Sequence, residues 1–187
     1  GTANLTNITV ANNSSAQGIY RAGGDVNVIS SIIWGNSSDD SGDITYSYTN
    51  RQGSPPSGDG NITKDPWFVD SGNRDYRLLP GSVSINRGDP NESDADGTRR
   101  DMGVHIYTDS HQGPVWYVSS DGDVLTGDGS SGNPLSSILA AVNLANEGDE
   151  VIVAEGTYIG EGNHNIYFLG KGVTVHSSGL TENTIID

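Results

Sequence analysis

The chain repeats short triplets of β-branched and other apolar residues at a nearly constant spacing. The triplet VIV at 151–153 is followed 22 residues later by VTV at 173–175. In a second copy written directly after Asp187, a further 22 residues lead to ITV at 8–10, and 24 more lead to IIW at 32–34. A period of about 20–25 residues built from short strands is typical of a solenoid of stacked coils. Because the period runs on from the tail of one copy into the head of the next, we expect one unit of a head-to-tail series or a circularly permuted domain.

The composition fits a solenoid with a thin core. Of the 187 residues, 33% are hydrophobic and 18% are charged, while glycine, asparagine and serine are abundant. This is too polar for a thick globular core, yet too rich in patterned β-branched residues for disorder. A solenoid reconciles the two observations because its core is a single narrow column.

Charge, cysteine content and hydropathy exclude several classes of partner and chemistry. The net charge of −15 argues against nucleic acid and against anionic membranes, because both bind Lys and Arg. The sequence contains no cysteine, so neither disulfides nor thiol chemistry are available. No apolar run approaches the ~18–20 residues that a membrane-spanning helix needs, so we expect no membrane insertion.

Alternating apolar and polar residues predict the strands of the coils. They occur at 5–10 and 29–34, and each run ends at an asparagine-containing turn. Asparagine tolerates left-handed backbone and bonds its own turn, so Asn12, Asn13 and Asn36 are expected to stack as a ladder. Shorter strands are expected at 18–20, 25–28 and 44–48.

The pattern divides the chain into two parts. Residues 51–62 form a Pro/Gly/Ser-rich loop, and the less repetitive stretch after it suits a cap over the end of the column. An amphipathic helix is expected at about 135–146, with Pro134 in its first turn and Gly148 after its end. The predicted order is rungs with a downstream cap (1–107), a connector (108–115), and an upstream cap with first rungs (116–187).

Two longer motifs lie on either side of the connector. DPWFVDSGNRDYRLLPGSVSINRGDP and DADGTRRDMG fall within 62–104, and WYVSSDGD and GDGSSGNPLSSILAAVNLANEGDEVIVAEGTY fall within 116–158. The first pair resembles the C-terminal end, and the second pair the N-terminal cap and first rung, of secreted pectate-lyase-like repeat proteins. The resemblance implies an all-β fold, a right-handed parallel β-helix with one short capping α-helix split into two half-solenoids. It also implies an extracellular or cell-surface location, but it does not select an activity, because such β-helices serve as lyases, hydrolases, adhesins and spacers.

The acidic stretch at 89–101 is the best candidate for a metal site. Alternating oxygen side chains followed by glycine let a loop wrap a hard cation, and Ca²⁺ takes about six to eight oxygens. The predicted ligands of a structural Ca²⁺ are Asp89, Asn91, Asp94, Asp96 and Asp101. The alternative is an acidic turn whose carboxylates cap backbone N–H groups or pair with Arg99 and Arg100. A weaker second candidate is the glycine-rich loop that carries Asp121, Asp123 and Asp128.

The sequence does not single out a catalytic constellation. A polysaccharide lyase needs a basic residue beside Ca²⁺ and cationic residues that hold the substrate, and the chain has only nine Lys and Arg residues. A glycosidase needs two carboxylates about 5–9.5 Å apart, and nothing distinguishes one pair among 24 acidic residues. We therefore expect no enzymatic activity.

The expected function is structural, as a subunit or tandem repeat unit of an extracellular filament or surface array. Rungs of residues 173–187 would stack on residues 1–10 of the next unit, with backbone hydrogen bonds continuing across the joint as in β-augmentation. The partner is then a second copy of the chain, and open strand edges are the assembly device. The predicted interface residues are Val173, Val175, Ile185, Ile186, Leu5, Ile8 and Val10.

Three alternatives stay open at this stage. In a circular permutant, the two termini of a single chain stack on each other and the connector runs back along the coil. In a longer covalent tandem protein, the chain is one window on a repeating polypeptide. In a carbohydrate-binding or polysaccharide-cleaving β-helix domain, the partner is a polysaccharide rather than a second copy.

Overall fold

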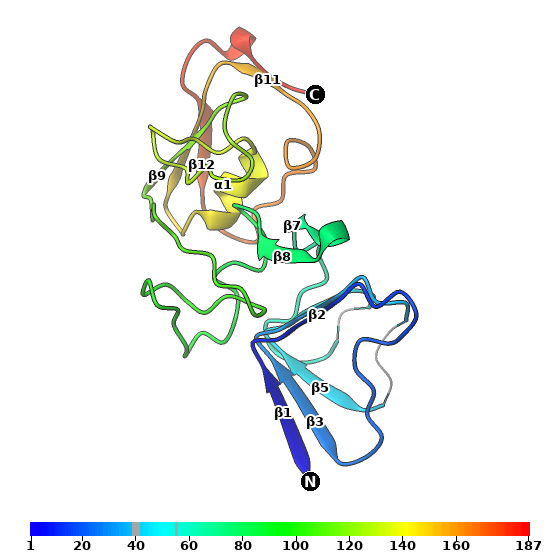
Figure 1. Ribbon diagram of the computed structural model, residues 1–187. Coiled ribbons are helices and arrows are strands. Elements are labelled where there is room, and N and C mark those ends of the chain that lie inside the picture. The colour runs from blue at the N-terminus through cyan, green and yellow to red at the C-terminus, as the bar shows by residue number, and fades with distance from the viewer. Residues whose placement is uncertain (39–41, 55) are drawn as a thin grey trace. The chain divides into compact units, whose positions relative to one another are not determined.

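The computed structural model describes residues 1–38, 42–54 and 56–187 (Figure 1). The described chain is mostly β with one short α-helix, which confirms the predicted all-β class. It forms two compact units: unit 1 contains Gly1–Leu78 and Ser82–Thr108, and unit 2 contains Leu79–Gly81 and Asp109–Asp187. Pro55, inside the loop predicted at 51–62, lies outside the described residues.

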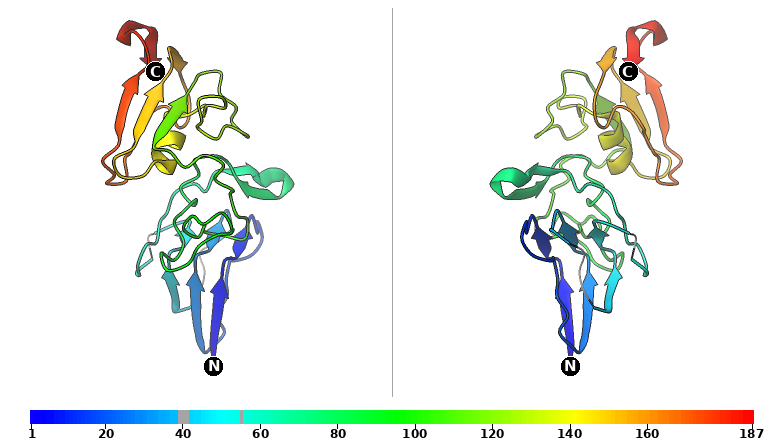
Figure 2. Two further views of the ribbon diagram at one scale, coloured as in Figure 1. Left: turned by 90° about the vertical axis from the view of Figure 1, so that its left-hand side faces the viewer. Right: turned by 90° about the vertical axis from the view of Figure 1, so that its right-hand side faces the viewer.

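Unit 1 contains two three-stranded parallel sheets whose strands alternate along the chain. The first sheet, in spatial order, consists of β1 (Thr2–Thr6), β3 (Asp25–Ile29) and β5 (Ile44–Ser47). The second consists of β2 (Thr9–Ala11), β4 (Ile32–Trp34) and β6 (Asn50–Arg51). Figure 2 shows the strands of the first sheet side by side, with β1 at its edge. Each pass of the chain therefore adds one strand to each sheet.

The register in unit 1 differs by one residue from the alignment of the sequence triplets. That alignment set Ile8 against Ile32, but the structure pairs Thr9 with Ile32. The reason is that Ile8 precedes β2 and lies in the corner between β1 and β2. The strand predicted at 18–20 is wrong, because no strand of the described structure covers these residues.

Two-residue corners interrupt the runs at 5–10 and 29–34 that were predicted as continuous strands. The corners are 7–8, 30–31 and 48–49. The first residue of each has left-handed backbone, with φ of 53° at Asn7, 48° at Ser30 and 49° at Tyr48. Left-handed backbone is uncommon outside glycine, and here it turns the chain from the first sheet into the second.

The core of unit 1 lies between the two sheets. Val28, Ile33 and Tyr46 are buried together, and Leu5 and Val10 of the outer strands pack against them half-buried. The opposite face of the second sheet is covered by residues 82–104. There the N–H of Gly103 donates to Ser30 O (2.9 Å) and Asn50 Nδ2 donates to Ser84 Oγ (3.0 Å). Unit 1 thus combines an apolar interior with a second layer of buried hydroxyl and amide groups.

A short hairpin belongs to unit 1 as well. Its antiparallel strands are β7 (Phe68–Asp70) and β8 (Asp75–Leu78), joined through the 3₁₀ turn η1 (Ser71–Asn73). Phe68 and Tyr76 meet edge to face, with ring centroids 5.1 Å apart. This stretch was predicted to break the repeat, and it is the one antiparallel strand pair in the described chain.

Unit 2 contains a second pair of parallel sheets. The larger consists of β9 (Val115–Val118), β10 (Glu150–Val153) and β12 (Thr174–Ser177), with β10 in the middle. The smaller consists of β11 (Gly156–Tyr158) and β13 (Thr184–Ile186), and η2 (Thr181–Asn183) precedes β13. Val151 pairs with Val175, two positions beyond the partner that the 22-residue spacing predicts. The sequence alignment of 151–153 with 173–175 was therefore wrong in register.

The helix α1 spans Ile138–Leu144, shorter than the predicted 135–146. Ser137 ends it on the N-terminal side, because its side chain accepts a hydrogen bond from the N–H of Ala140 (3.2 Å) in the manner of an N-cap. Leu135 lies outside the helix and pairs with Val118 of β9 instead. All seven residues of α1 are buried, as expected for a helix that covers the interior of unit 2.

Candidate functional site: the open sheet edges

One edge of the sheets in unit 1 is capped by irregular chain. Along β6, the N–H of Arg51 donates to Ile62 O and the N–H of Ile62 donates to Thr49 O, both at 3.0 Å. Beside β5, Asn61 Nδ2 donates to Tyr46 O (2.9 Å). The outer backbone groups of these strands are therefore satisfied within the unit, which closes this side of the stack.

One edge of the larger sheet in unit 2 is capped in the same way. The N–H of Tyr117 donates to Gly129 O (2.8 Å), and Tyr117 O accepts from the N–H of Leu135 (2.9 Å). Ser119, just after β9, donates its N–H to Leu135 O (2.9 Å). The loop before α1 thus closes the edge of β9 with ordinary backbone hydrogen bonds.

The opposite edge of unit 2 is open. The N–H of Thr174 donates to Asp149 O (3.0 Å) and the N–H of Ser178 donates to Val153 O (2.8 Å), so these residues of the β12 segment face β10. In a parallel ladder, the backbone groups of alternate residues face opposite neighbours. Val175 and Ser177 therefore direct their N–H and C=O groups away from β10. Across the described residues, these groups have no backbone partner.

The opposite edge of unit 1 is open too. In β1, Gly1 O accepts from the N–H of Asp25 and the N–H of Asn7 donates to Ile29 O, both at 3.1 Å. By the same alternation, Thr2, Asn4 and Thr6 direct their backbone groups away from β3.

In β2, the outward-directed residues are Thr9 and Ala11. Their neighbours bond inward, since Ile8 O accepts from the N–H of Ile32 (2.9 Å) and the N–H of Asn12 donates to Trp34 O (3.0 Å). Ala11 O has one contact within unit 1, a long hydrogen bond of 3.4 Å from the hydroxyl of Tyr76. The edge of unit 1 is therefore open along β1 and only partly occupied along β2.

Apolar columns run up to both open edges and end there. In unit 2, Val151 is 0% exposed, whereas its register partner Val175 in β12 is half-buried. Tyr158 is 1% exposed, whereas its partner Ile186 in β13 is 53% exposed. Each column thus loses its cover at the outermost strand.

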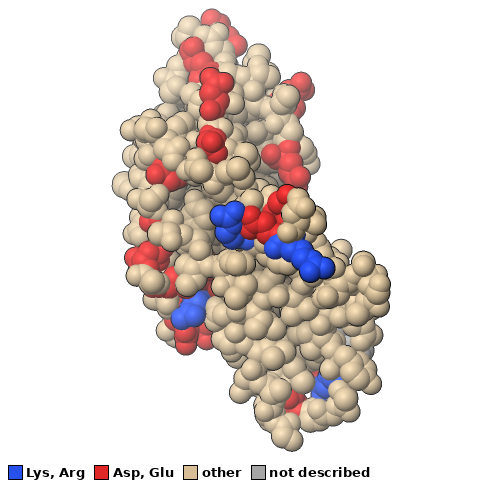
Figure 3. Space-filling view, in the orientation of Figure 1, with Lys and Arg blue, Asp and Glu red and all other residues tan. Residues whose placement is uncertain are grey.

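The open edges lack the residues that usually protect edge strands. Natural proteins block such edges with Lys, Pro, inward-pointing charges or bulges. The sequences of β1 (TANLT), β2 (TVA), β12 (TVHS) and β13 (TII) contain no Lys, Arg, Asp, Glu or Pro. On the face shown in Figure 3, few charged side chains lie over the part of unit 1 that holds β1, β3 and β5. Nothing in these four strands repels a further strand.

The predicted interface residues lie at or beside these edges. Leu5 and Val10 are half-buried in β1 and β2, and Ile8 lies in the corner between the two strands. Val175 lies in β12, and Val173 immediately precedes it. Ile185 and Ile186 are 51% and 53% exposed in β13.

Asparagine ladders follow the stack in unit 1. Asn13 Nδ2 donates to Asn36 Oδ1 (2.8 Å), which confirms that part of the predicted ladder. Asn12 does not take part, because its Nδ2 donates to Ser71 O (2.8 Å). A second rung, Asn27 Nδ2 to Asn4 Oδ1 (2.9 Å), was missed, although the two residues lie 23 positions apart in the sequence.

His176 is the one titratable residue on the strands of the open edges. Its Nδ1 lies 2.9 Å from Ser177 O, and its Nε2 lies 2.7 Å from Glu150 Oε1 of β10. Both contacts raise the pKa of His176 above its ordinary value of 6.5, the backbone contact more than the carboxylate. The protonated imidazole therefore ties β12 to β10 on the outer face of the sheet.

The carboxylates predicted as Ca²⁺ ligands bind protein N–H groups. Asp101 is buried, and its two oxygens accept from the N–H of Asn86 (2.7 Å) and of Tyr107 (2.6 Å). Asp94 is also buried; its Oδ2 accepts from the N–H of Asp101 (2.8 Å), and its Oδ1 lies 3.5 Å from Arg100 Nε. These contacts tie together the segment that covers the second sheet.

The other predicted ligands form short-range turns. Asp89 Oδ1 accepts from both the N–H and the Nδ2 of Asn91 (2.9 Å each), and Asp96 Oδ1 accepts from the N–H of Thr98 (3.0 Å). In the second acidic loop, Asp123 Oδ1 accepts from two backbone N–H groups, which lowers its pKa. In the described chain, no three His, Cys, Asp or Glu side chains converge as a metal-binding group. The Ca²⁺ site stays a prediction, and backbone capping accounts for the acidic residues without it.

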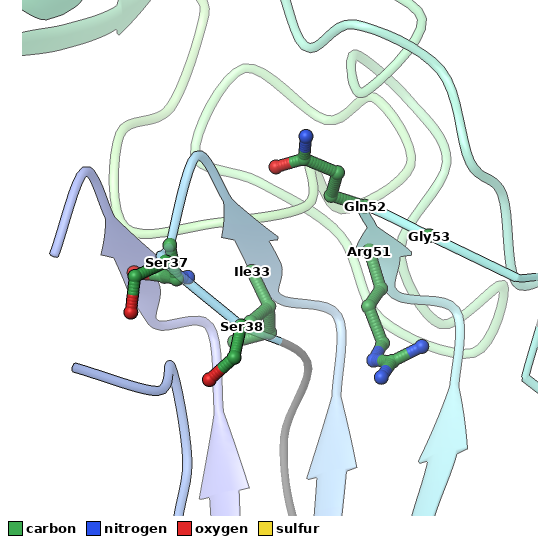
Figure 4. Close-up of a pocket in the computed structure, with 7 residues that line it drawn as sticks. Ile33, Ser37, Ser38, Arg51, Gln52 and Gly53 are labelled. Carbon is green, nitrogen blue, oxygen red and sulfur yellow. The ribbon is translucent and has the colours of Figure 1, made fainter. Parts of the chain in front are cut away.

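A shallow groove of about 250 Å³ lies on unit 1 (Figure 4). Its lining is mostly polar and comprises Ile33, Asn36, Ser37, Ser38, Arg51, Gln52 and Gly53. The side chains of Arg51 and Gln52 extend to opposite sides, as adjacent residues of an extended segment do. Both are engaged within the unit, since Arg51 Nη1 donates to Ser54 O (3.2 Å) and Gln52 Oε1 accepts from the N–H of Gly35 (2.7 Å).

Comparison of the chain with protein-family models, with curated proteins and with solved structures found no match. Within the ranges that the structure describes, no helix has the length and apolar character needed to cross a membrane. The site is therefore interpreted from its own geometry.

Proposed function

We propose that the chain is a structural stacking unit of an extracellular filament, surface array or tandem-repeat polypeptide, built on a right-handed parallel β-helix. The alternation of strands between two parallel sheets in each unit supports this, because successive coils of a β-helix add one strand to each sheet. Pairing of strands about 23 residues apart in unit 1 agrees with the length of a solenoid repeat. The cap motifs near 62–104 and 116–158 favour the same class.

The observation that carries the proposal is the contrast between capped and open edges. Unit 1 is closed at β5 and β6 and open at β1 and β2, whereas unit 2 is closed at β9 and open at β12 and β13. The open edge of unit 2 ends a stack on its C-terminal side, and the open edge of unit 1 begins one on its N-terminal side. A tail edge placed on a head edge continues a parallel stack, which two head edges or two tail edges cannot do.

Sedimentation and electron microscopy of the purified chain test the proposal. We expect concentration-dependent, open-ended oligomers that the substitution Val175→Lys abolishes, because it places a charge in the apolar column at the joint. The matched control is Thr45→Lys in β5, an exposed position beside the capped edge. A monodisperse 19.6 kDa particle at all concentrations would contradict the proposal.

A second candidate function rests on the polar groove of unit 1. Its amide, hydroxyl and guanidinium groups offer the kind of hydrogen bonding that a polysaccharide uses, so the alternative is a carbohydrate-binding domain. Calorimetric titration with an anionic polysaccharide tests it, with Arg51→Ala as the variant expected to lose binding. Binding that survives this substitution would remove the groove from consideration.

A further inference from the structure

Every coil places its inward-facing residues at the same intervals. In unit 1, Ala3 and Val10 occupy the register positions of Val26 and Ile33 in the next coil. The two members of each pair are seven residues apart, with a two-residue corner between their strands. In unit 2, Val151 of β10 and Tyr158 of β11 are also seven residues apart, across the corner at 154–155.

This spacing shows which strands of the two units are equivalent. β10 is the strand before the corner and β11 the strand after it, as β1 and β2 are in unit 1. Because β12 pairs with β10 and β13 pairs with β11, the next coil in line would set a β1-like strand on β12 and a β2-like strand on β13.

Resting on the function proposed above, we infer that the partner of β12 and β13 is unit 1 of a second copy of this chain. In this joint β1 lies on β12 with Ala3 opposite Val175, and β2 lies on β13 with Val10 opposite Ile186. The register differs from the one that the triplet spacing predicts, in which 173–175 would face 8–10. That prediction aligned a strand before a corner with a strand after one.

The backbone groups on the two edges fit this register. Within unit 2, inward-facing residues bond to the following strand, since Val118 O accepts from the N–H of Ala154 (2.8 Å) and Val153 O from the N–H of Ser178 (2.8 Å). Val175 is the next inward-facing residue and directs its groups outward. In the inferred register its N–H meets Thr2 O, and its C=O meets the N–H of Asn4, two residues whose groups point away from β3.

The side chains fit as well. The column that ends at Val175 would continue through Ala3 to Val26 and Ile44, and the column that ends at Ile186 would continue through Val10 to Ile33. Ile186, 53% exposed on unit 2, would then lie between Tyr158 and Val10. Continuing the apolar columns gives the joint the same interior as the coils on either side of it.

A directly concatenated copy cannot form this joint. Only Asp187 and Gly1 would then separate β13 from β1, and two residues extend the chain by roughly 7 Å. The return from one coil to the next takes residues 12–24 between β2 and β3, and 159–173 between β11 and β12. The second copy is therefore a separate chain, or one joined through a linker of comparable length.

Disulfide trapping tests the register, because the native chain has no cysteine. Thr174 would lie opposite Thr2 in the inferred register, and opposite Thr9 in the register that sets 173–175 against 8–10. Neighbouring strands are about 4.8 Å apart, within the Cα separation that a disulfide spans. The double variants Thr2→Cys/Thr174→Cys and Thr9→Cys/Thr174→Cys thus differ only in which Thr near the N-terminus is replaced.

Under mild oxidation, we expect Thr2→Cys/Thr174→Cys to give a ladder of linked oligomers, at least ~10-fold more abundant than from Thr9→Cys/Thr174→Cys, because stacking raises the effective thiol concentration. A ladder from the Thr9 variant instead overturns the register and leaves the stacking function standing. Linkage within single chains overturns the second copy as partner. No linkage in either variant, with a monomer in sedimentation, contradicts the proposed function itself.

Discussion

The strand edges of this protein are of two kinds, and the difference concerns how a stack of coils ends. At β5, β6 and β9, loop residues such as Ile62 and Leu135 occupy the outer backbone groups. At β12 and β13, the outer groups face outward and the apolar columns lose their cover. The capped edges show that irregular chain is enough to terminate a stack. An edge without such a cap retains the hydrogen-bonding pattern that a further coil would use.

The largest expected loss of stability concerns the segment that covers the second sheet of unit 1. Replacing Asp101 by Ala leaves the buried N–H groups of Asn86 and Tyr107 without their acceptor and should lower the free energy of unfolding by about 3 kcal/mol. Asp96→Ala, which removes only a local turn contact, should cost less than about 1 kcal/mol. Chemical denaturation with and without a chelator measures both.

The same pair of variants examines the Ca²⁺ prediction. If backbone capping explains the acidic residues, the loss in Asp101→Ala is unchanged by chelation. A native protein that loses stability in chelator, down to the level of Asp101→Ala, would show that the carboxylates act through a bound cation instead.

A matched pair of valines compares an inner strand with an open one. Val151→Ala should lower the free energy of unfolding by about 2 kcal/mol, because it opens a cavity at a fully buried position. Val175→Ala removes the same atoms one coil further out and should cost less than about 1 kcal/mol in dilute protein. Denaturation at low concentration measures the difference, and equal losses would show that β12 is not an edge.

Asparagines compare a capped edge with an open one at smaller magnitude. Asn61→Ala removes the donor to Tyr46 O and the acceptor for the N–H of Thr49, and should cost about 1–2 kcal/mol. Asn13→Ala removes one exposed ladder contact and should cost less than about 0.5 kcal/mol. Thermal denaturation of the two variants ranks them, and the reverse order would argue that the loop is not what closes β5.

The smallest expected effect is the pH dependence from His176. Because its folded-state pKa is raised, its contribution to stability is fully present below the ordinary value of 6.5 and is lost as the pH rises through the folded value. His176→Gln should flatten this decline without altering stability at high pH. Melting temperatures measured across this pH range check it, and an unchanged slope in the variant would assign the decline to other groups.

The sequence predicted the class of fold better than its registers. Short β-branched runs mark the strands, because half-buried strands need such residues at alternate positions. The runs at 5–10 and 29–34 do not reveal that Asn7 and Ser30 adopt left-handed backbone and divide each run between two sheets. Spacing alone therefore aligned Ile8 with Ile32, where the structure pairs Thr9 with Ile32.

The candidate site was predictable in its location and not in its details. Val175 and Val10 stood out as apolar positions in short strands, but which backbone groups face outward depends on pairing that spacing does not encode. The acidic stretch shows the same limit. Asp94 and Asp101 match a cation-binding pattern in sequence, whereas their hydrogen bonds to backbone N–H groups depend on segments brought near by folding.

Residue-resolved amide hydrogen exchange at low and high protein concentration tests the open edges most directly. In dilute protein, the amides of Val175 and Ser177 should exchange rapidly, whereas those of Thr174 and Ser178 should be protected by β10. At concentrations that support stacking, Val175 and Ser177 should become protected together with Asn4 of the second copy. Protection of Val175 that is already complete in the monomer, or that never changes while oligomers form, would contradict the account.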